Sequence, residues 1–254
     1  RQRGSLRCGG HSLLPLGFAG EPIRQEWPQC MGIRLAFPAA RHGRALGHIN
    51  IALINEMAMF CHELGIDIWE VVRLASSKPY GFQAFYPGPG VGGHCIPVDP
   101  NYLSYEVKRR LGTPFRFIET ATDINTGMPA YVVNRIQDLL NQQGKALKGS
   151  NVLILGATYK PDIADLRESP SLEVAEILVE KGSNMKFHDP HAESFRMHGD
   201  VYHRVENLDS ALAEADVVVV LVAHAAYDFE DIKKKSKVIF DTRGKLSGAN
   251  VERL

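Results

Sequence analysis

The chain has 254 residues, a formal net charge of zero and an ordinary apolar fraction of 44%. Zero net charge argues against nucleic-acid and membrane-surface partners, and no apolar run is long enough to cross a bilayer. Its four cysteines, Cys8, Cys30, Cys61 and Cys95, are too few for a disulfide scaffold. Because no export signal is visible either, we expect a cytoplasmic protein of one large domain or two ordinary ones.

Residues 1–47 differ in composition from the rest of the chain. They hold seven arginines, no lysine, and only Glu21 and Glu26 as acids. No helical or alternating apolar period lasts two turns. A basic arm for nucleic acid is one interpretation, but lysine clusters and interleaved aromatic residues are missing. We therefore predict a foreign or disordered leader that carries no chemistry.

The chain from His48 onward has the apolar spacing of helices. Residues 48–64 place apolar side chains on one face, and Gly65 is a plausible stop. Asp67 is placed to cap a second helix over residues 68–77. This part of the chain is therefore predicted to be helical.

Two more helices follow a long loop. Asp99 before Pro100 is a helix start signal, and Gly112 would end that helix. Another helical pattern covers residues 117–142, where Gly127 and Pro129 should break or bend it.

The second half alternates between strands and helices. Buried-strand patterns occupy residues 151–157, 184–190, 216–223 and 237–244, and helical patterns occupy 169–182 and 205–215. This alternation predicts a parallel sheet with helices on both faces. Ligands of such sheets bind at the carboxyl ends of the strands, where Lys160, Asp189 and Arg243 fall.

The loop "FYPGPGVGGHCIPVDP", residues 85–100, holds the leading candidate for chemistry. An arbitrary cysteine in a loop is most often a small apolar residue. Around Cys95, however, glycines such as Gly92 permit close approach of a ligand, and His94 is adjacent. The helix start at Asp99 would favour a thiolate. Capping alone explains Asp99, although a cap beside a cysteine could also position water.

Other readings of these motifs remain open. The run "GPGVGG" follows no strand and opens no helix, so it is not a dinucleotide fingerprint. One glycine in "LGATYK" favours a mononucleotide or diphosphate over NAD in this half. Lys160 is then either a solvated lysine or a phosphate contact, and Arg167 with Glu168 reads as a surface ion pair.

Two further chemistries find little support. Zinc at Cys61–His62 or His94–Cys95 lacks a second, properly spaced ligand pair, so we expect no metal. A cysteine hydrolase using His94 and Cys95 lacks an orienting third group.

Three motifs together carry a resemblance. The cysteine loop, "GATYKPDIADLRESPS" and "FDTRG" closely resemble the UDP-sugar 6-dehydrogenase family, over about residues 48–254. The match looks nearest to bacterial UDP-N-acetylglucosamine or N-acetylhexosamine 6-dehydrogenases. The resemblance implies an N-terminal NAD-binding Rossmann domain, a central helical dimerisation region and a C-terminal UDP-sugar-binding domain. It also implies oxidation of the sugar's C6 alcohol to a carboxylate with two NAD molecules.

The resemblance implies a role for each candidate residue. Cys95 matches the nucleophile, which forms a thiohemiacetal and then a thioester, and Asp99 matches an aspartate linked to water activation. Substrate contacts fall at Gly92, Lys160 and Arg243. Cofactor-side positions fall at His94 and Arg167.

The sequence departs from the family at two points. A glycine-rich NAD domain is absent, and a lysine–asparagine pair of the family falls at Ala40 and Arg44. The general acid/base and the hydride acceptor site are therefore expected to be missing.

These observations predict an α/β protein of three parts: a leader at 1–47, a central helical domain at 48–147 and a Rossmann-like domain at 148–254. We expect a UDP-sugar ligand, NAD as the family's cofactor and a homodimer or higher homo-oligomer, in a chain that is inactive alone. The alternative is a non-catalytic UDP-sugar-binding and dimerisation module.

Overall fold

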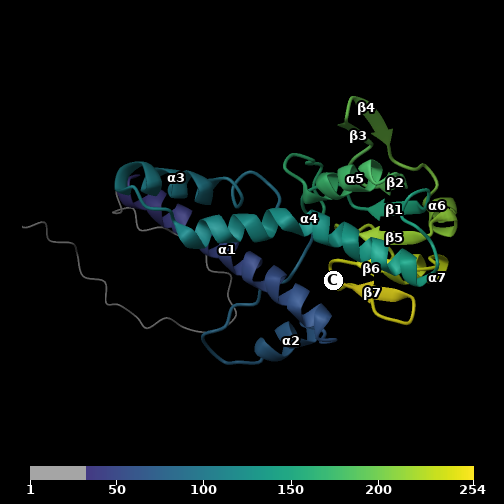
Figure 1. Ribbon diagram of the computed structural model, residues 1–254, viewed down its shortest axis with the longest axis horizontal. Helices are drawn as coiled ribbons and strands as arrows, with labels where there is room; N and C mark the ends of the chain where they lie inside the picture. The colour runs from purple at the N-terminus through teal and green to yellow at the C-terminus, as the bar shows by residue number, and fades with distance from the viewer. Residues whose placement is uncertain (1–32) are drawn as a thin grey trace, which may run out of the picture.

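The computed structural model describes residues 33–254, which form a helical arm and a sheet domain (Figure 1). The arm contains the helices α1 (Ile33–Glu63), α2 (Ile68–Ala75), α3 (Asp99–Leu111) and α4 (Arg116–Gln142). α1 and α4 lie side by side, and α3 packs on both of them. The predicted helical region followed by a parallel-sheet domain is thus confirmed.

Helix α1 begins well before the predicted boundary at residue 48. It starts at Ile33, so the expectation of an unstructured leader is wrong for residues 33–47, and residues 1–32 lie outside the described part. Ala45 and His48 are buried, at 5% and 2% exposure. With Ala52 and Asn55 they share one helix face. Because this face is small and polar, it leaves no hydrophobic period in the sequence.

Helix α4 runs unbroken through Gly127 and Pro129, so of the predicted break or bend the break is wrong. Met128, Val132 and Val133 are fully buried around the proline. Their packing holds the helix together, although Pro129 cannot donate to the carbonyl of Asn125. Burial of the surrounding side chains outweighs the lost hydrogen bond and the low helix propensity.

The sheet domain is built on five parallel strands in the order β2-β1-β5-β6-β7. They are β1 (Asn151–Leu155), β2 (Asn184–His188), β5 (Val217–Val220), β6 (Ile239–Asp241) and β7 (Val251–Arg253). The four predicted strands are confirmed. The three-residue β7 and the hairpin of β3 (Ser194–Met197) and β4 (Asp200–His203) were missed, because they are short and carry little continuous apolar sequence.

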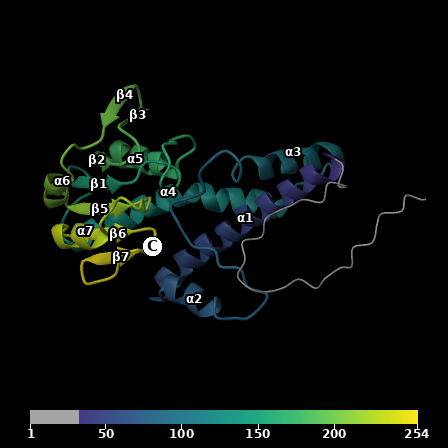
Figure 2. The same ribbon diagram turned by 180° about the vertical axis from the view of Figure 1, so that it is seen from behind.

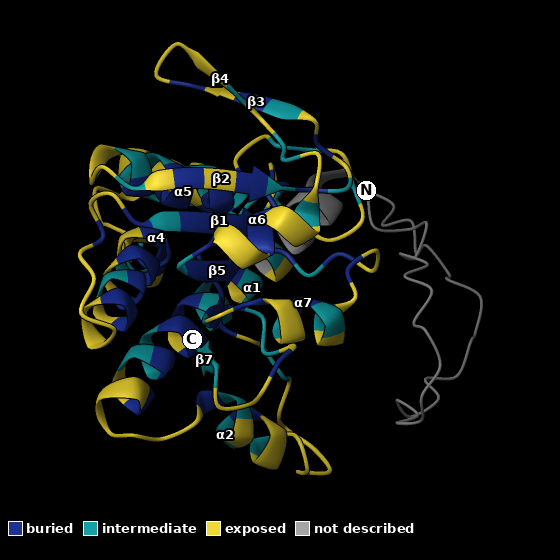
Figure 3. Cartoon of the chain, turned by 90° about the vertical axis from the view of Figure 1, so that its right-hand side faces the viewer, coloured by how far each residue is buried: buried dark blue, intermediate teal, exposed yellow. Residues whose placement is uncertain are grey.

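Helices cover both faces of the sheet (Figure 3). The C-terminal half of α4 and α5 (Pro170–Glu180) pack on one face, while α6 (Leu208–Glu214) and α7 (Phe229–Lys235) pack on the other. Central strands β1 and β5 are almost wholly buried. Because α4 belongs to both the arm and this core, the two parts share one continuous element.

Local capping follows the sequence closely. Asp67 accepts a hydrogen bond from the Trp69 N–H at 3.0 Å, and Ser169 caps α5. Gly112 ends α3 in the left-handed conformation at φ 71°. Within residues 33–254, none of the helices combines the length and apolar character that crossing a bilayer needs.

The strand order sets where a ligand could bind. The chain leaves β1 toward β2 on one side and returns to β5 on the other. At such a switch point the loops diverge and leave a crevice at the carboxyl ends of the strands. The segments after β1, β5 and β6 therefore surround the expected ligand edge.

Candidate functional site

The cysteine loop is anchored at its start by a buried amide. The Gly88 N–H donates to Oδ1 of Asn55 on α1 at 2.9 Å. The amide nitrogen of Asn55 donates to Oδ1 of Asn125 on α4 at 3.0 Å, and Asn55 is 0% exposed. Unpaired polar groups in such a place would be costly, so each bond depends on the next.

This amide chain continues toward the start of α3. Asn125 donates to the carbonyl of His48 at 3.2 Å, and His48 Nε2 lies 3.2 Å from the hydroxyl of Thr122. That hydroxyl also lies 3.2 Å from the side-chain oxygen of Asn101 on α3. Burial lowers the pKa of His48 below its usual value of 6.5, which keeps the ring neutral. The chain of contacts thus joins α1, α3, α4 and the loop.

The glycines of the loop meet protein atoms rather than open space. A Cβ on Gly92 would lie 2.8 Å from the Glu168 carbonyl oxygen and 2.9 Å from Tyr159 Cβ. On Gly93, which has φ +85°, it would lie 2.8 Å from the Tyr159 ring. The Gly93 N–H donates to the Glu168 carbonyl at 3.1 Å. Gly92 therefore lets the loop pack on the sheet domain, whereas the sequence pointed to a ligand.

Cys95 lies in a short helical turn that leads into α3. It is an exposed free thiol, and the Asp99 N–H donates to its carbonyl at 3.1 Å. Asp99 was predicted to cap α3, but it is the first helical residue and its side chain makes no capping bond. The predicted cap is absent because the Asp99 carboxylate pairs with the guanidinium of Arg44 on α1.

His94 and Arg167 meet at one carboxylate. Arg167 grips Asp165 with two side-chain nitrogens at 2.9 and 2.8 Å, and His94 Nε2 lies 3.8 Å from the same carboxylate. The Arg167 guanidinium holds the pKa of Asp165 well below its usual range. Arg167 is 72% exposed on its side chain. These two predicted cofactor-side residues are thus brought together, with Asp165, which the sequence analysis missed.

Arg243 reaches from the sheet to the start of the loop. Its Nε donates to the Leu221 carbonyl at 2.5 Å, and a Cβ on Gly88 would lie 2.8 Å from its Nη1. Asp241 orders the turn by accepting the Arg243 and Leu246 N–H groups at 2.8 and 2.7 Å. Burial lowers the pKa of Arg243 to about 10. The predicted substrate arginine therefore lies directly against the glycine that begins the cysteine loop.

Trp69 supports the same corner, although sequence reasoning gave it no role. Its ring stacks on Tyr86 with centroids 6.0 Å apart, and its Nε1 donates to the Leu254 carbonyl at 3.1 Å. A Cβ on Gly244 would lie 2.5 Å from the ring. One side chain of α2 thus contacts the loop, the turn after β6 and the C-terminal residue, which lies close to α2 in the view from behind (Figure 2).

Lys160 and Asp189 differ in whether their charged groups are accessible to a ligand. Lys160 is exposed, with its ammonium 5.6 Å from the Tyr159 ring centroid. Asp189 is fully buried and accepts hydrogen bonds from Ala157 N–H and His224 Nε2 at 2.7 and 3.0 Å. Burial would raise the pKa of Asp189, but these hydrogen bonds outweigh it and lower the pKa. Lys160 can therefore contact a ligand, whereas Asp189 ties the strand ends together.

One cluster beside these strand ends has metal-binding side chains. Asp162, His191 and His224 bring ligand atoms within 4.8 Å of one another. His224 Nδ1, however, already accepts the Asp162 N–H at 3.0 Å. The Nδ1 lone pair is therefore not available to a metal ion. Hydrogen bonding between the two loops that carry these residues explains the cluster. Within the described residues, neither Cys61–His62 nor His94–Cys95 belongs to a ligand cluster.

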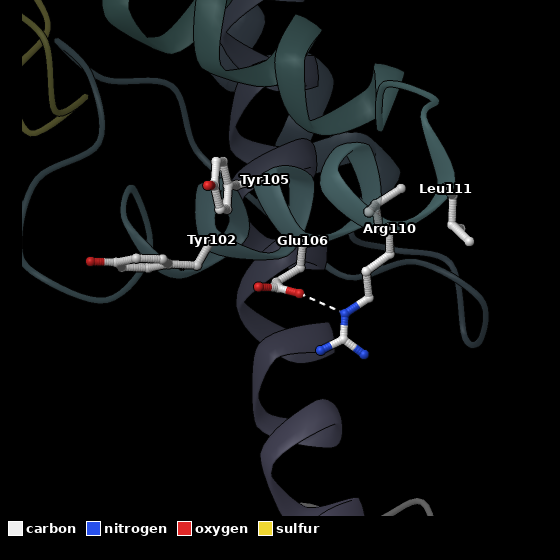
Figure 4. A pocket seen from close by; sticks show the side chains of 6 residues that line it. Tyr102, Tyr105, Glu106, Arg110 and Leu111 are labelled. Carbon is white, nitrogen blue, oxygen red and sulfur yellow. Dashed lines mark hydrogen bonds and ion pairs between the residues drawn. The ribbon is translucent and has the colours of Figure 1, made fainter.

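A hollow in the described surface lies elsewhere. It measures about 620 Å³ on the outer face of α3 and is lined by Tyr102, Tyr105, Glu106, Val107, Arg110 and Leu111 (Figure 4). Glu106 and Arg110 pair across its floor at 2.8 Å. Because no residue of the cysteine loop lines it, this hollow is separate from the candidate site.

Comparison with known families agrees with this geometry. The central-domain model of the UDP-glucose/GDP-mannose dehydrogenase family matches residues 44–127, and its UDP-binding-domain model matches residues 153–248. Together the two matches cover more than half of the chain. The chain belongs to this family. The central match begins at Arg44, inside the segment predicted to be a leader.

Individual relatives act on N-acetylated sugars. The chain is 37% identical over 206 residues to a UDP-N-acetyl-D-mannosamine dehydrogenase of Methanococcus maripaludis, covering 78% of this chain and 45% of that protein. It is 34% identical over 211 residues to an NDP-N-acetyl-D-galactosaminuronic acid dehydrogenase of Ralstonia nicotianae, covering 82% and 47%. The chain thus spans less than half the length of these relatives.

Solved structures show the same architecture. An NDP-N-acetyl-D-galactosaminuronic acid dehydrogenase of Methanosarcina mazei superposes with a TM-score of 0.73 at 27% identity, over 87% of this chain and 50% of that one. A UDP-N-acetylmannosamine dehydrogenase of Pyrococcus horikoshii gives a TM-score of 0.71 at 27% identity, over 84% and 50%. These names are of the mannosamine and galactosaminuronic types, so a preference for UDP-N-acetylglucosamine stays a prediction.

The buried amide chain yields a stability prediction. Asn55→Asp keeps an acceptor for the Gly88 N–H but loses the donor to Asn125 and buries a charge. We expect a loss of about 2–4 kcal/mol in the free energy of unfolding, measured in urea. Asn50→Asp is the matched control, because among residues 33–254 the Asn50 side chain bonds only the Leu46 carbonyl of its own helix. Equal losses in the two variants would contradict the role of the chain.

His48 yields a pH prediction. Because burial lowers its pKa in the folded state, the unfolded chain takes up the proton first as the pH falls through 6.5. Stability should therefore be fully retained above pH 6.5 and decline below it. In His48→Gln the free energy of unfolding should fall less steeply with decreasing pH. The difference in slope should be less than about 1.4 kcal/mol per pH unit, which is the largest slope that one titrating proton can cause. Urea unfolding between pH 7.5 and 5 tests this, and parallel profiles for both proteins would refute it.

Proposed function

We propose that this chain binds a UDP-N-acetylhexosamine at the carboxyl ends of its strands and presents Cys95 to C6 of the sugar. It would serve as the central and UDP-binding parts of an NAD-dependent 6-dehydrogenase. The contact of Arg243 with Gly88 carries this proposal. It brings the turn after β6 against the start of the loop that bears the thiol.

Charge at this edge suits a nucleoside diphosphate. Lys160 is exposed beside Tyr159, and Arg243 is held in place by the Leu221 carbonyl. Cations fixed at the ends of parallel strands bind phosphate oxygens through charge-assisted hydrogen bonds. Lys160 and Arg243 are therefore the proposed substrate contacts, while Gly92 sets the spacing between the loop and the sheet.

The chemistry assigned to Cys95 is addition to an aldehyde. The sulfur attacks the C6 carbonyl carbon, a carbon–sulfur bond forms, and the carbonyl oxygen gains a proton to give a thiohemiacetal. This step needs an exposed thiol, which Cys95 provides, and no cofactor. A reducing cytosol suits it, because the thiol must stay free, and the uronate product would serve surface polysaccharide synthesis.

NAD would accept hydride in such an enzyme, but residues 33–254 do not fit a dinucleotide. Gly156 alone follows β1, and its Cβ position is filled by Val222, 2.4 Å away. No helix begins there, because α5 starts only at Pro170. His94 and Arg167 remain proposed cofactor-side residues, and this chain alone is proposed to be inactive.

Calorimetry with UDP-sugars tests the proposal. UDP-N-acetylglucosamine, its mannosamine and galactosamine epimers and UDP-glucose should bind in an order that identifies the preferred sugar. Arg243→Met should weaken binding about 10- to 100-fold, the range expected for a lost charge-assisted bond. Arg196→Met, at an exposed position of β3, is the matched control and should bind normally.

Three outcomes would limit or reject parts of this proposal. A folded chain that binds no uridine nucleotide would reject it. A non-catalytic UDP-sugar module would bind the nucleotide without protecting Cys95 from alkylation, whereas a site that presents Cys95 to the sugar should protect it. Formation of NADH by this chain with both substrates would contradict the proposed lack of activity.

We also propose a homodimer formed through the arm. Leu53, Phe60, Leu64 and Leu74 on α1, α2 and their junction are 53–71% exposed, which is unusual for large apolar side chains. Sedimentation should show a dimer at micromolar concentration, and Phe60→Glu should weaken association at least tenfold. Glu63→Gln, one turn away, is the control. A strictly monomeric mass at high micromolar concentration would rule the dimer out.

A further inference from the structure

Asp99 is not a free carboxylate in this chain. The Arg44 guanidinium of α1 pairs with it directly, across 55 residues of sequence. Both side chains are partly shielded, with 41% of Arg44 and 22% of Asp99 exposed. Partial shielding makes such a pair stronger than a fully exposed one.

Asp99 and Cys95 belong to the same turn. The Asp99 N–H bonds the Cys95 carbonyl at 3.1 Å, which is the spacing of a helical turn. Side chains four apart in such a turn have Cβ atoms about 5–6 Å from each other. The Asp99 charge therefore acts on any reactant that approaches the thiol.

A second carboxylate, near His94, is paired in the same way. Asp165, 3.8 Å from His94, is gripped by Arg167 through two nitrogens. Two carboxylates near this segment, Asp99 and Asp165, are thus each matched by an arginine. Loss of Arg44 would leave the Asp99 charge unpaired one turn from Cys95.

We propose that Arg44 is the positioning residue that neutralises Asp99 and so opens Cys95 to an anionic reactant. A UDP-sugar carries a doubly charged diphosphate, and an unpaired carboxylate beside the thiol would repel it. One Asp99 oxygen, Oδ2, is bonded to Arg44, so Asp99 also fixes the cysteine turn to α1. The relevance to catalysis rests on the proposed function, but the electrostatic effect on Cys95 does not.

The test compares two alkylating reagents of different charge. Iodoacetate is an anion and iodoacetamide is neutral, yet both react with the same thiolate. The ratio of their rate constants therefore reports the charge around Cys95 independently of the thiolate fraction. Cys8→Ser and Cys30→Ser remove the other candidate thiols from the assay, while buried Cys61 is kept. Cys95→Ser gives the background rate.

Four variants give distinct expectations at low salt. Arg44→Met should lower the iodoacetate-to-iodoacetamide ratio about three- to tenfold, as expected for one unit charge at this range. Arg44→Lys should keep the ratio near that of the parent protein. Asp99→Asn should raise it, because Arg44 then stands unpaired. The double variant Arg44→Met/Asp99→Asn should return it to the parent value.

Added salt tests whether the change in the ratio is electrostatic, and UDP-sugar binding tests the proposed function separately. The differences should shrink in 1 M NaCl, where charges are screened within about 3 Å. An unchanged ratio in both Arg44→Met and Asp99→Asn would overturn the inference, and the second variant decides if the first fails to fold. If the ratios shift as expected but no UDP-sugar binds in calorimetry, the proposed function fails while Arg44's role stands.

Discussion

The arrangement of the site depends on one buried hydrogen bond, from the Gly88 N–H to the Asn55 side chain. Asn55 has no access to water, so its other groups must be satisfied by Asn125, and Asn125 in turn by His48. A buried chain of hydrogen bonds is stable only when each polar group in it has its partner. The arm, the loop and the helix that bears Asp99 are therefore fixed together.

Helix α4 transmits this order to the sheet domain. Its first half carries Asn125, and its second half packs into the core beneath β1, β5 and β6. The loop lies against both parts, bonded to Asn55 on one side and to Glu168 on the other. Because the same helix serves both cores, the distance from Arg243 to the cysteine turn is set by packing rather than by a hinge.

Sequence patterns predicted the sheet domain well and the arm only in part. Buried strands and capped helices leave local signals, and these placed four of the strands and the starts of α2 and α5. The early part of α1 left none, because Ala45 and His48 make its buried face small and polar. Asn55 and Asn125 did leave a trace, as single polar residues on apolar helix faces. Their pairing could not be known, since it joins segments 70 residues apart.

The same limit explains why several site residues changed meaning. Glycines, a capping aspartate and a surface arginine each have a common local role, and sequence reasoning can assign only that role or a ligand contact. In the structure Gly92 meets Glu168, Asp99 meets Arg44 and Arg167 meets Asp165. Gly92, Asp99 and Arg167 therefore each have a protein contact that the sequence did not indicate. The groups proposed to meet a reactant are the exposed Cys95 thiol, the exposed Lys160 ammonium and the Arg243 guanidinium, whose Nε alone is bonded to protein among the described residues.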